Sequence, residues 1–123
     1  NYSIDGLSAL PPEDASALGE VLAPARSFYL DVAPDPAHWD VFSGKVLRMW
    51  RTSPNYSALD LARIEAPVLV MAGENDSIKR LHTEEMAQAI PDATLDIVPG
   101  ASHFLPLEMP GRANASILTF LGR

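Results

Sequence analysis

The sequence predicts an α/β fold in which a helical segment precedes a β-α-β-α unit with two parallel strands. A continuous apolar run at 67–72 and an alternating apolar and polar run at 93–97 have the lengths and patterns of strands. Apolar residues at helical spacing lie before, between and after these runs, and a strand-helix-strand unit joins parallel strands. We therefore divide the chain into residues 1–64, an entry loop and helices, and residues 65–123, the β-α-β-α part.

The amino-terminal half begins with an aperiodic segment, residues 1–10, which predicts an entry loop. Pro11 and Pro12 suit the first turn of a helix over about 12–31, and Pro24 either ends or kinks that helix. Asp35 and Pro36 are the start signal of a second helix. Its apolar stripe consists of Trp39, Phe42, Val46, Met49 and Trp50.

A break at 53–55 ends the second helix, and a short third helix follows it. Ser57, with Asp60 three residues later, has the spacing of a capping box at the start of that helix. We expect the three helices to form one segment ahead of the first strand.

The strand over 67–72 is apolar throughout, which is typical of a strand buried on both faces. The strand over 93–97 alternates, so we expect Thr94 and Asp96 to face solvent. A helix over about 77–90 connects the strands, and the last helix covers about 109–121. The inner side of the connecting helix is expected to hold Ile78, Leu81, Met86, Ala89 and Ile90.

Two strands are too few for an independently stable sheet, and a strand buried on both faces normally has sheet neighbours along both edges. We therefore expect a neighbouring strand that is not part of this sequence. The first residue is Asn1 and no initiator methionine precedes it. The simplest expectation is that these 123 residues are a piece of a longer chain.

Composition excludes several classes of function. A formal net charge of −7 disfavours nucleic acid as a partner, and no apolar run is long enough to span a membrane. The absence of cysteine excludes disulfides and thiolate catalysis and fits a reducing, cytoplasmic location. The three histidines are scattered and no glycine-rich phosphate loop is present, so we expect neither a metal site nor a cofactor.

Asp76 and His103 each follow one of the two predicted strands. Ligands of open α/β sheets bind beyond the carboxyl ends of the strands, and neighbouring strands lie about 4.8 Å apart. A carboxylate beside an imidazole fixes its tautomer and suits it for general-base work on a hydroxyl nucleophile. Taken separately, Asp76 also fits a turn or cap residue and His103 a solvated loop residue.

Aromatic side chains supply the candidate substrate-binding residues. Trp39, Met49 and Trp50 share the stripe of the second helix and either line a substrate pocket or pack as an ordinary apolar face. Phe104 follows His103 directly and completes the substrate-binding set.

Residues 61–121 resemble the carboxyl-terminal part of α/β-hydrolase-fold enzymes. The matching motifs are Gly73-Glu74-Asn75-Asp76 and Gly100-Ala101-Ser102-His103-Phe104, followed by Glu108, Pro110 and Phe120-Leu121. The helical segment before them resembles, more loosely, the lid of that family. The resemblance implies a partial α/β-hydrolase fold, a lid followed by the last two core strands, with Asp76 as triad acid and His103 as base.

The same resemblance implies a serine nucleophile inside a G-x-S-x-G motif, and no such motif occurs in this chain. Ser8 lies in Gly6-Leu7-Ser8-Ala9-Leu10, which lacks the second glycine, and Ser102 adjoins His103. Asp5 stands where some members place an alternative acid, although an Asp-Gly turn explains it more simply.

We therefore expect a fragment of a hydrolase that acts on a small ester, lactone or similar carbonyl substrate through a Ser-His-Asp triad. Its serine lies outside the chain, so the isolated chain is expected to be inactive. Carbon–carbon bond, epoxide and haloalkane chemistry stay open, the last two with an aspartate nucleophile. The partner of the hydrolase fragment is the missing amino-terminal half of the core. The alternative is a non-catalytic module whose exposed strand and lid helices pair with a second copy of the chain or with another protein.

Overall fold

The computed structural model describes residues 3–7 and 19–122, which belong to two compact units. One unit comprises Asn1–Ala9 together with Asn55–Arg123, and the other comprises Leu10–Pro54. The lid and core boundary near residue 65 stays a prediction. Each unit is described by itself below.

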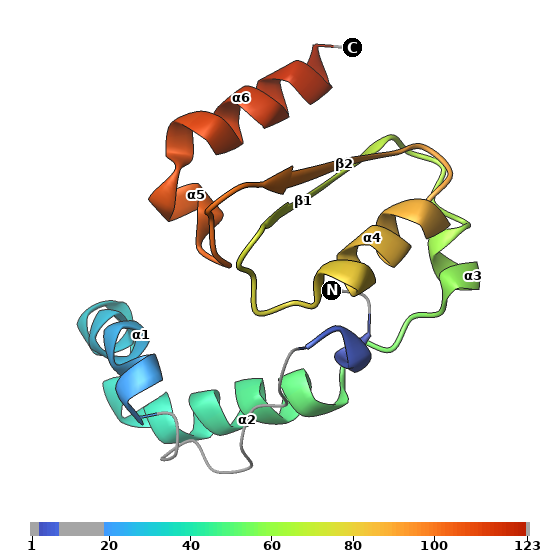
Figure 1. Ribbon diagram of the computed structural model, residues 1–123. Helices are drawn as coiled ribbons and strands as arrows, with labels where there is room; N and C mark the ends of the chain where they lie inside the picture. The colour runs from blue at the N-terminus through green and yellow to red at the C-terminus, as the bar shows by residue number, and fades with distance from the viewer. Residues whose placement is uncertain (1–2, 8–18, 123) are drawn as a thin grey trace. The chain divides into compact units, whose positions relative to one another are not determined.

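The first unit contains the parallel sheet. Strand β1 (Val68–Gly73) pairs with strand β2 (Ala93–Val98) in parallel, from Val68 opposite Ala93 to Gly73 opposite Val98. Helix α4 (Arg80–Ala89) connects the strands, and the remaining elements are η1 (Ile4–Gly6), α3 (Ala58–Leu61), α5 (Leu105–Glu108) and α6 (Pro110–Leu121). The predicted α/β class and its β-α-β-α order are confirmed (Figure 1).

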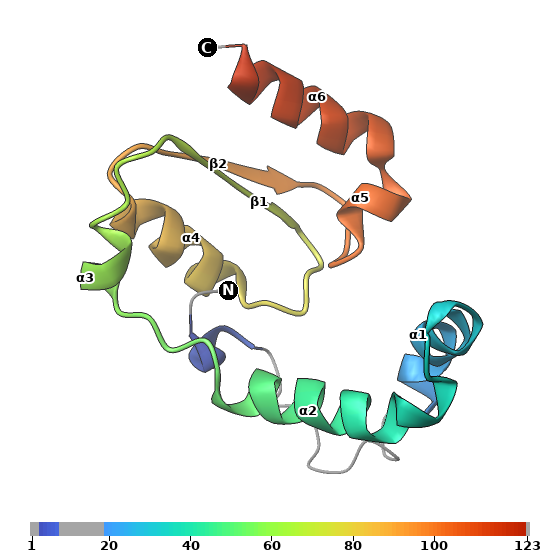
Figure 2. The ribbon, with the colours of Figure 1, turned by 180° about the vertical axis from the view of Figure 1, so that it is seen from behind.

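Helices cover both faces of the two strands, with α4 on one side and α6 on the other (Figures 1 and 2). On the α4 side, a cluster of buried residues consists of Leu61, Val70 and Ile90. On the α5 and α6 side, a second cluster consists of Val98, Ala101, Leu105 and Ala113, with Met71 packed against it. The buried Val70 and the half-buried Met71 therefore enter opposite cores, so both faces of β1 are covered by helices.

The expectation that Asp96 faces solvent is wrong. Asp96 Oδ1 lies 2.6 Å from an Arg112 guanidinium nitrogen, and Asp96 Oδ2 accepts a 2.5 Å hydrogen bond from Ser116 Oγ. Both partners belong to α6, which covers this face of β2. The polar residue in the alternating pattern of β2 is therefore a carboxylate that is paired beneath α6. Leu95, on the other face of β2, is 40% exposed.

The connecting helix begins later than predicted; Met86, Ala89 and Ile90 pack against the core as expected, but the expectation that Leu81 is buried is wrong. His82 and Thr83 are 5% and 4% exposed, whereas Leu81 is 65% exposed. Thr83, Met86, Ala87 and Ile90 follow the i, i+3, i+4, i+7 spacing of one helix face, and Leu81 lies off that stripe. The last predicted helix, over about 109–121, is confirmed as α6, and the short α5 before it was not predicted.

Among residues 3–7 and 19–122, strand β1 pairs with another strand along one edge only. That edge carries β2, and the other edge of β1 faces no strand among these residues. The sheet therefore has the two strands that the sequence predicted.

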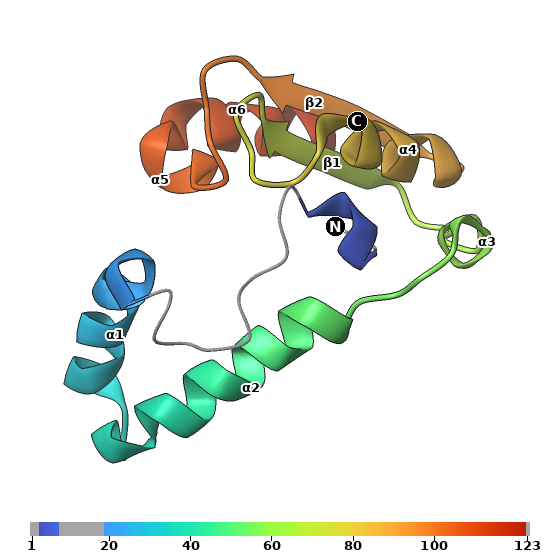
Figure 3. The same ribbon diagram turned by 60° about the horizontal axis from the view of Figure 1, so that its bottom comes forward.

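The second unit is a helical pair. Helix α1 (Gly19–Val32) continues past Pro24, and a 3₁₀ turn, η3 (Pro36–His38), leads into α2 (Trp39–Thr52) (Figure 3). Asp35 caps the turn by accepting a 3.1 Å hydrogen bond from the Ala37 amide, as its position before Pro36 predicted. The predicted helical residues 12–18 and the loop residues 8–10 lie outside the described part of the chain. Across that described part, no helix is long and apolar enough to span a bilayer.

Candidate active site

Asp76 and His103 lie side by side beyond the ends of β1 and β2. Nδ1 of His103 is 2.9 Å from Oδ1 of Asp76, although 27 residues separate the two in sequence. The Asp76 side chain is 11% exposed and the His103 side chain 56% exposed. The shielded carboxylate of Asp76 keeps the proton of the neutral ring on Nδ1. Nε2 is therefore the ring nitrogen that can accept a proton from a reactant.

Gly73 allows the loop carrying His103 to approach the end of β1. A Cβ at residue 73 would lie 2.3 Å from the carbonyl oxygen of Ala101 and 2.4 Å from that of Ser102. The two loops are also joined by a 2.9 Å hydrogen bond from the Asn75 amide to the Ala101 carbonyl. A side chain on residue 73 would separate the loops that bring Asp76 and His103 together.

The loop of Asp76 is held at its other end by residues 3–7. The Lys79 amide donates a 2.7 Å hydrogen bond to the Gly6 carbonyl, and Lys79 Nζ donates a 2.8 Å hydrogen bond to the Asp5 carbonyl. Asp76 Oδ1 also accepts a 2.8 Å hydrogen bond from the Ile78 amide. Asp76 therefore acts as a turn residue and as the partner of His103 at the same time.

The Asp5 side chain takes part in a local turn. Its Oδ2 accepts a 3.2 Å hydrogen bond from Ser3 Oγ, and Asp5 is exposed. This arrangement agrees with the simpler explanation of Asp5 as a turn residue.

The loop of His103 carries two carboxylate contacts that sequence reasoning had not assigned. Glu108 accepts hydrogen bonds from the Ser102 amide, at 2.8 Å, and from Ser102 Oγ, at 2.6 Å. These bonds lower the pKa of Glu108 below its ordinary value. Glu74 Oε2 accepts a 2.9 Å hydrogen bond from the Gly100 amide. The signal in sequence was the motif match that included Glu74 and Glu108, without a role for either.

Three serine hydroxyls have hydrogen-bond partners other than His103. Ser102 Oγ donates to Glu108, and Ser77 Oγ lies 3.5 Å from Asp76 Oδ1. Ser43 Oγ, in the helical unit, donates a 3.3 Å hydrogen bond to the Asp40 carbonyl. Ser8 lies outside the described residues. None of these three described hydroxyls is bonded to His103.

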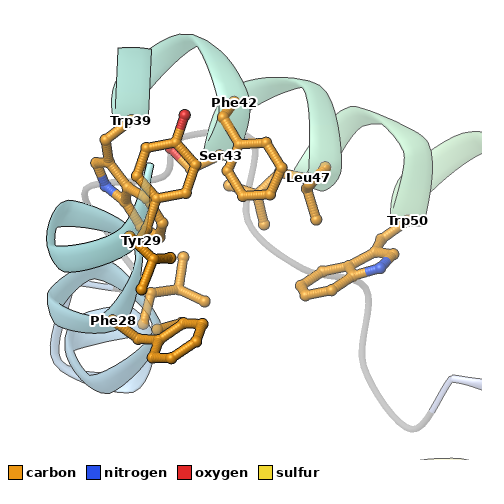
Figure 4. Close-up of a pocket in the computed structure, with 11 residues that line it drawn as sticks. Phe28, Tyr29, Trp39, Phe42, Ser43, Leu47 and Trp50 are labelled. Atoms are coloured by element: carbon orange, nitrogen blue, oxygen red, sulfur yellow. The ribbon is translucent and has the colours of Figure 1, made fainter. Parts of the chain in front are cut away.

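The predicted substrate-binding residues fall in two places. Trp39 and Trp50 line an apolar pocket of about 400 Å³ between α1 and α2, whereas Met49 is 50% exposed and is not part of its wall (Figure 4). Tyr29 and Phe42 stack in that pocket with ring centroids 5.0 Å apart. Phe104 lies edge-on to the His103 ring at 5.9 Å in the other unit.

The other two histidines differ in their environments. His82 is buried in α4, and burial lowers its pKa. His38 is exposed at the end of η3. Residues 3–7 and 19–122 contain no cluster of three His, Asp or Glu side chains placed to hold a metal ion.

Comparisons with known proteins bear on the family and the fold of this chain. A family model described as the alpha/beta hydrolase family matches residues 3–116. Epoxide hydrolase A of Mycobacterium tuberculosis is 31% identical over 134 residues, which cover 90% of this chain and 42% of that protein. Carboxylesterase YbfK of Bacillus subtilis is 34% identical over 64 residues, which cover 50% of this chain and 22% of that protein.

Among solved structures, a serine hydrolase involved in carbazole degradation superposes with a TM-score of 0.64 at 18% identity. The superposition covers 96% of this chain and 42% of that one, and it shows a common fold. The chain spans half or less of the length of the curated relatives that it matches. With its parallel strands and the match over residues 3–116, the chain belongs to the alpha/beta hydrolase family.

Proposed function

We propose that this chain supplies the acid and the base of a serine hydrolase that acts on an ester, lactone or similar carbonyl substrate. The observation that carries the proposal is the 2.9 Å contact between Asp76 Oδ1 and His103 Nδ1. In this role Asp76 orients the imidazole and stabilises its protonated form, and His103 is the general base. The match to the alpha/beta hydrolase family supports hydrolysis in general, and the carboxylesterase relative supports an ester in particular.

The proposed reaction follows from the orientation of the ring. Nε2 of His103 takes the proton of a serine hydroxyl while the serine oxygen attacks the substrate carbonyl carbon. The imidazolium then gives that proton to the leaving alkoxide, and an acyl-enzyme remains. Water repeats the sequence, with His103 again as the base, and releases the acid.

We place the nucleophile outside these 123 residues. The chain contains no G-x-S-x-G motif, and the hydroxyl closest to His103 in sequence, that of Ser102, donates to Glu108. The missing amino-terminal part of the core would bring the serine, and the substrate would bind in the completed enzyme. Trp39, Met49, Trp50 and Phe104 are the proposed substrate-binding side chains.

A serine-reactive phosphonate tests the placement of the nucleophile. The 123-residue chain alone should acquire no stoichiometric, site-specific label. The coding sequence upstream should contain an in-frame G-x-S-x-G motif, and the protein that includes it should be labelled at that serine. Stoichiometric labelling of one residue in the isolated chain would contradict the proposal.

Nuclear magnetic resonance tests the roles of the pair. A proton shared by His103 Nδ1 and Asp76 should give a downfield imidazole signal that exchanges slowly with water. Asp76→Asn should abolish that signal, while Glu65→Gln, at an exposed site, should leave it unchanged. A signal that survives Asp76→Asn would exclude Asp76 as the orienting acid.

The open edge of β1 favours a second candidate function, a non-catalytic module that associates through strand pairing. A strand with an open edge is a template for association, here with a second copy of the chain or with another protein. Light scattering after size-exclusion chromatography tests it. The module predicts a concentration-dependent rise in mass, and a stable monomer at high concentration would count against it.

A further inference from the structure

The side chains of the loop that carries His103 are too exposed for packing alone to hold them. His103 is 56% exposed at its side chain, and the following Phe104 is 62% exposed. The rotamers open to an exposed imidazole depend on its backbone, and a fixed backbone on both sides keeps the ring within reach of Asp76. Whatever holds the ring against Asp76 must therefore act through the residues next to it.

Hydrogen bonds to the residues on both sides of His103 meet at one side chain. The Ser102 amide donates to Glu108, and the Phe104 amide donates a 3.1 Å hydrogen bond to Ser102 Oγ. Ser102 Oγ in turn donates to the second oxygen of Glu108. The single carboxylate of Glu108 thus holds the residue before His103 directly and the residue after it through one hydroxyl.

Glu108 itself is on a fixed element. It ends α5, whose first residue, Leu105, is 3% exposed in the core cluster with Val98 and Ala101. The Glu108 amide also donates a 3.0 Å hydrogen bond to the Phe104 carbonyl. Glu108 therefore connects the exposed His103 loop to an element that is anchored in the buried core.

We propose that Ser102 and Glu108 are positioning residues that keep the His103 imidazole on Asp76. The inference rests on the proposed roles of His103 and Asp76. Glu108 and Ser102 make no contact with a reacting atom in this assignment. They limit the rotamers of His103, so that Nε2 keeps one direction. The bonds from Ser102 lower the pKa of Glu108, which keeps its carboxylate ionised, and therefore a double acceptor, into mild acid.

The test compares Ser102→Ala with Ser102→Thr in the full chain, again with the downfield Nδ1 proton of His103 as the readout. Ser102→Ala should speed exchange of that proton with water roughly tenfold or abolish its signal, because one hydrogen bond to a charged group changes an opening equilibrium by about that factor. Ser102→Thr keeps the hydroxyl and should restore slow exchange. An unchanged signal in Ser102→Ala would overturn the proposal.

The chain offers a matched control in α3. Ser57 Oγ and the Ser57 amide donate to Asp60 at 2.6 and 2.8 Å, which is the same pair of bonds as in Ser102 and Glu108. Ser57→Ala should lower stability without changing the His103 signal. If Ser57→Ala and Ser102→Ala change it equally, the effect is general loosening and the proposal is wrong.

A second measurement decides the question if Ser102→Ala does not fold or if the imidazole signal is absent. In Glu108→Gln, amide exchange at Ser102 and Phe104 should accelerate together, since both amides depend on that carboxylate. Exchange that is unchanged at both would overturn the positioning role. An absent imidazole signal in the unmodified chain, with both amides protected, would instead count against the Asp76–His103 pair and leave the Glu108 bonds established.

Discussion

The carbonyl oxygen of Ala101 occupies the space that a side chain on Gly73 would need. A Cβ there would be 2.3 Å from that oxygen, and real Cβ atoms do not approach backbone oxygens so closely. Gly73→Ala should therefore push the His103 loop away from β1 and destabilise the fold by about 1–3 kcal/mol. Urea unfolding measures the stability, and the amide shifts of residues 100–104 report the displacement.

Gly111→Ala is the control for that substitution. A Cβ at Gly111, in α6 of the same unit, would meet no atom within 4 Å. This variant should be neutral or more stable by up to about 1 kcal/mol, because alanine is the better helix former. Equal destabilisation by both substitutions would mean that the close approach at Gly73 is not the cause.

Ser57→Ala should cost about 1 kcal/mol of stability, within the range measured for loss of helix caps. Ser57 Oγ accepts a 3.2 Å hydrogen bond from the Asp60 amide, and the Ser57 amide donates to the Asp60 carboxylate, so both halves of a capping box are present. Ser57→Thr retains the hydroxyl and should recover most of the loss. Thermal and urea unfolding check the pair, and a Thr variant as weak as the Ala variant would argue against the cap.

Stability should fall as the pH drops through the acid range, and Asp96 should account for part of the fall. Burial raises the pKa of Asp96, but the hydrogen bonds from Ser116 and Arg112 outweigh it and hold that pKa below its ordinary value. A carboxyl with a lowered folded pKa stabilises the fold above its unfolded pKa of about 3.9 and loses that contribution as the pH falls through the folded value.

Asp96→Asn tests this assignment, because it removes the titrating group while retaining an acceptor oxygen. Urea unfolding at a series of pH values below about 5 should show a shallower loss of stability for the variant than for the unmodified chain. Parallel curves for the two proteins would show that Asp96 does not contribute.

Leu47→Ala should destabilise the helical unit by about 2–5 kcal/mol, the usual cost of truncating a buried leucine. Leu47 is 2% exposed and lines the pocket between α1 and α2. Both tryptophans of the chain, Trp39 and Trp50, line the same pocket, so tryptophan fluorescence reports on its unfolding. Val41→Ala, on the same helix at a 50% exposed position, should change stability by less than about 0.5 kcal/mol.

The fold class was predictable because each strand has a local signature. The apolar run at 68–72 and the alternation at 93–97 indicate strands without knowledge of the rest of the chain. The meeting of Asp76 and His103 followed from topology, since both residues leave parallel strands at the same sheet edge. Ser57 and Asp60 were predictable for the same reason, because a capping box lies within four residues.

Contacts between distant residues were not predictable from local patterns. Asp96 reads as a solvent-facing residue because its partners Arg112 and Ser116 lie 16 and 20 residues away. Leu81 was misplaced because its apolar side chain was taken as buried, whereas the polar His82 and Thr83 lie on the covered side at the start of α4. Met49 belongs to the same apolar stripe of α2 as Trp50 but lies outside the pocket wall. Residue spacing identifies an apolar stripe and does not show which of its residues reach the pocket.

The single crossover through α4 has a consequence for the order of folding. Asp76 and His103 are 27 residues apart and are joined by one strand-helix-strand unit. Closing a loop of that length costs little more entropy than closing a shorter one, since the cost rises only with the logarithm of loop length. The two residues can therefore meet early, as soon as β2 docks beside β1, and the kinetics of that docking should limit how quickly the imidazole reaches its carboxylate.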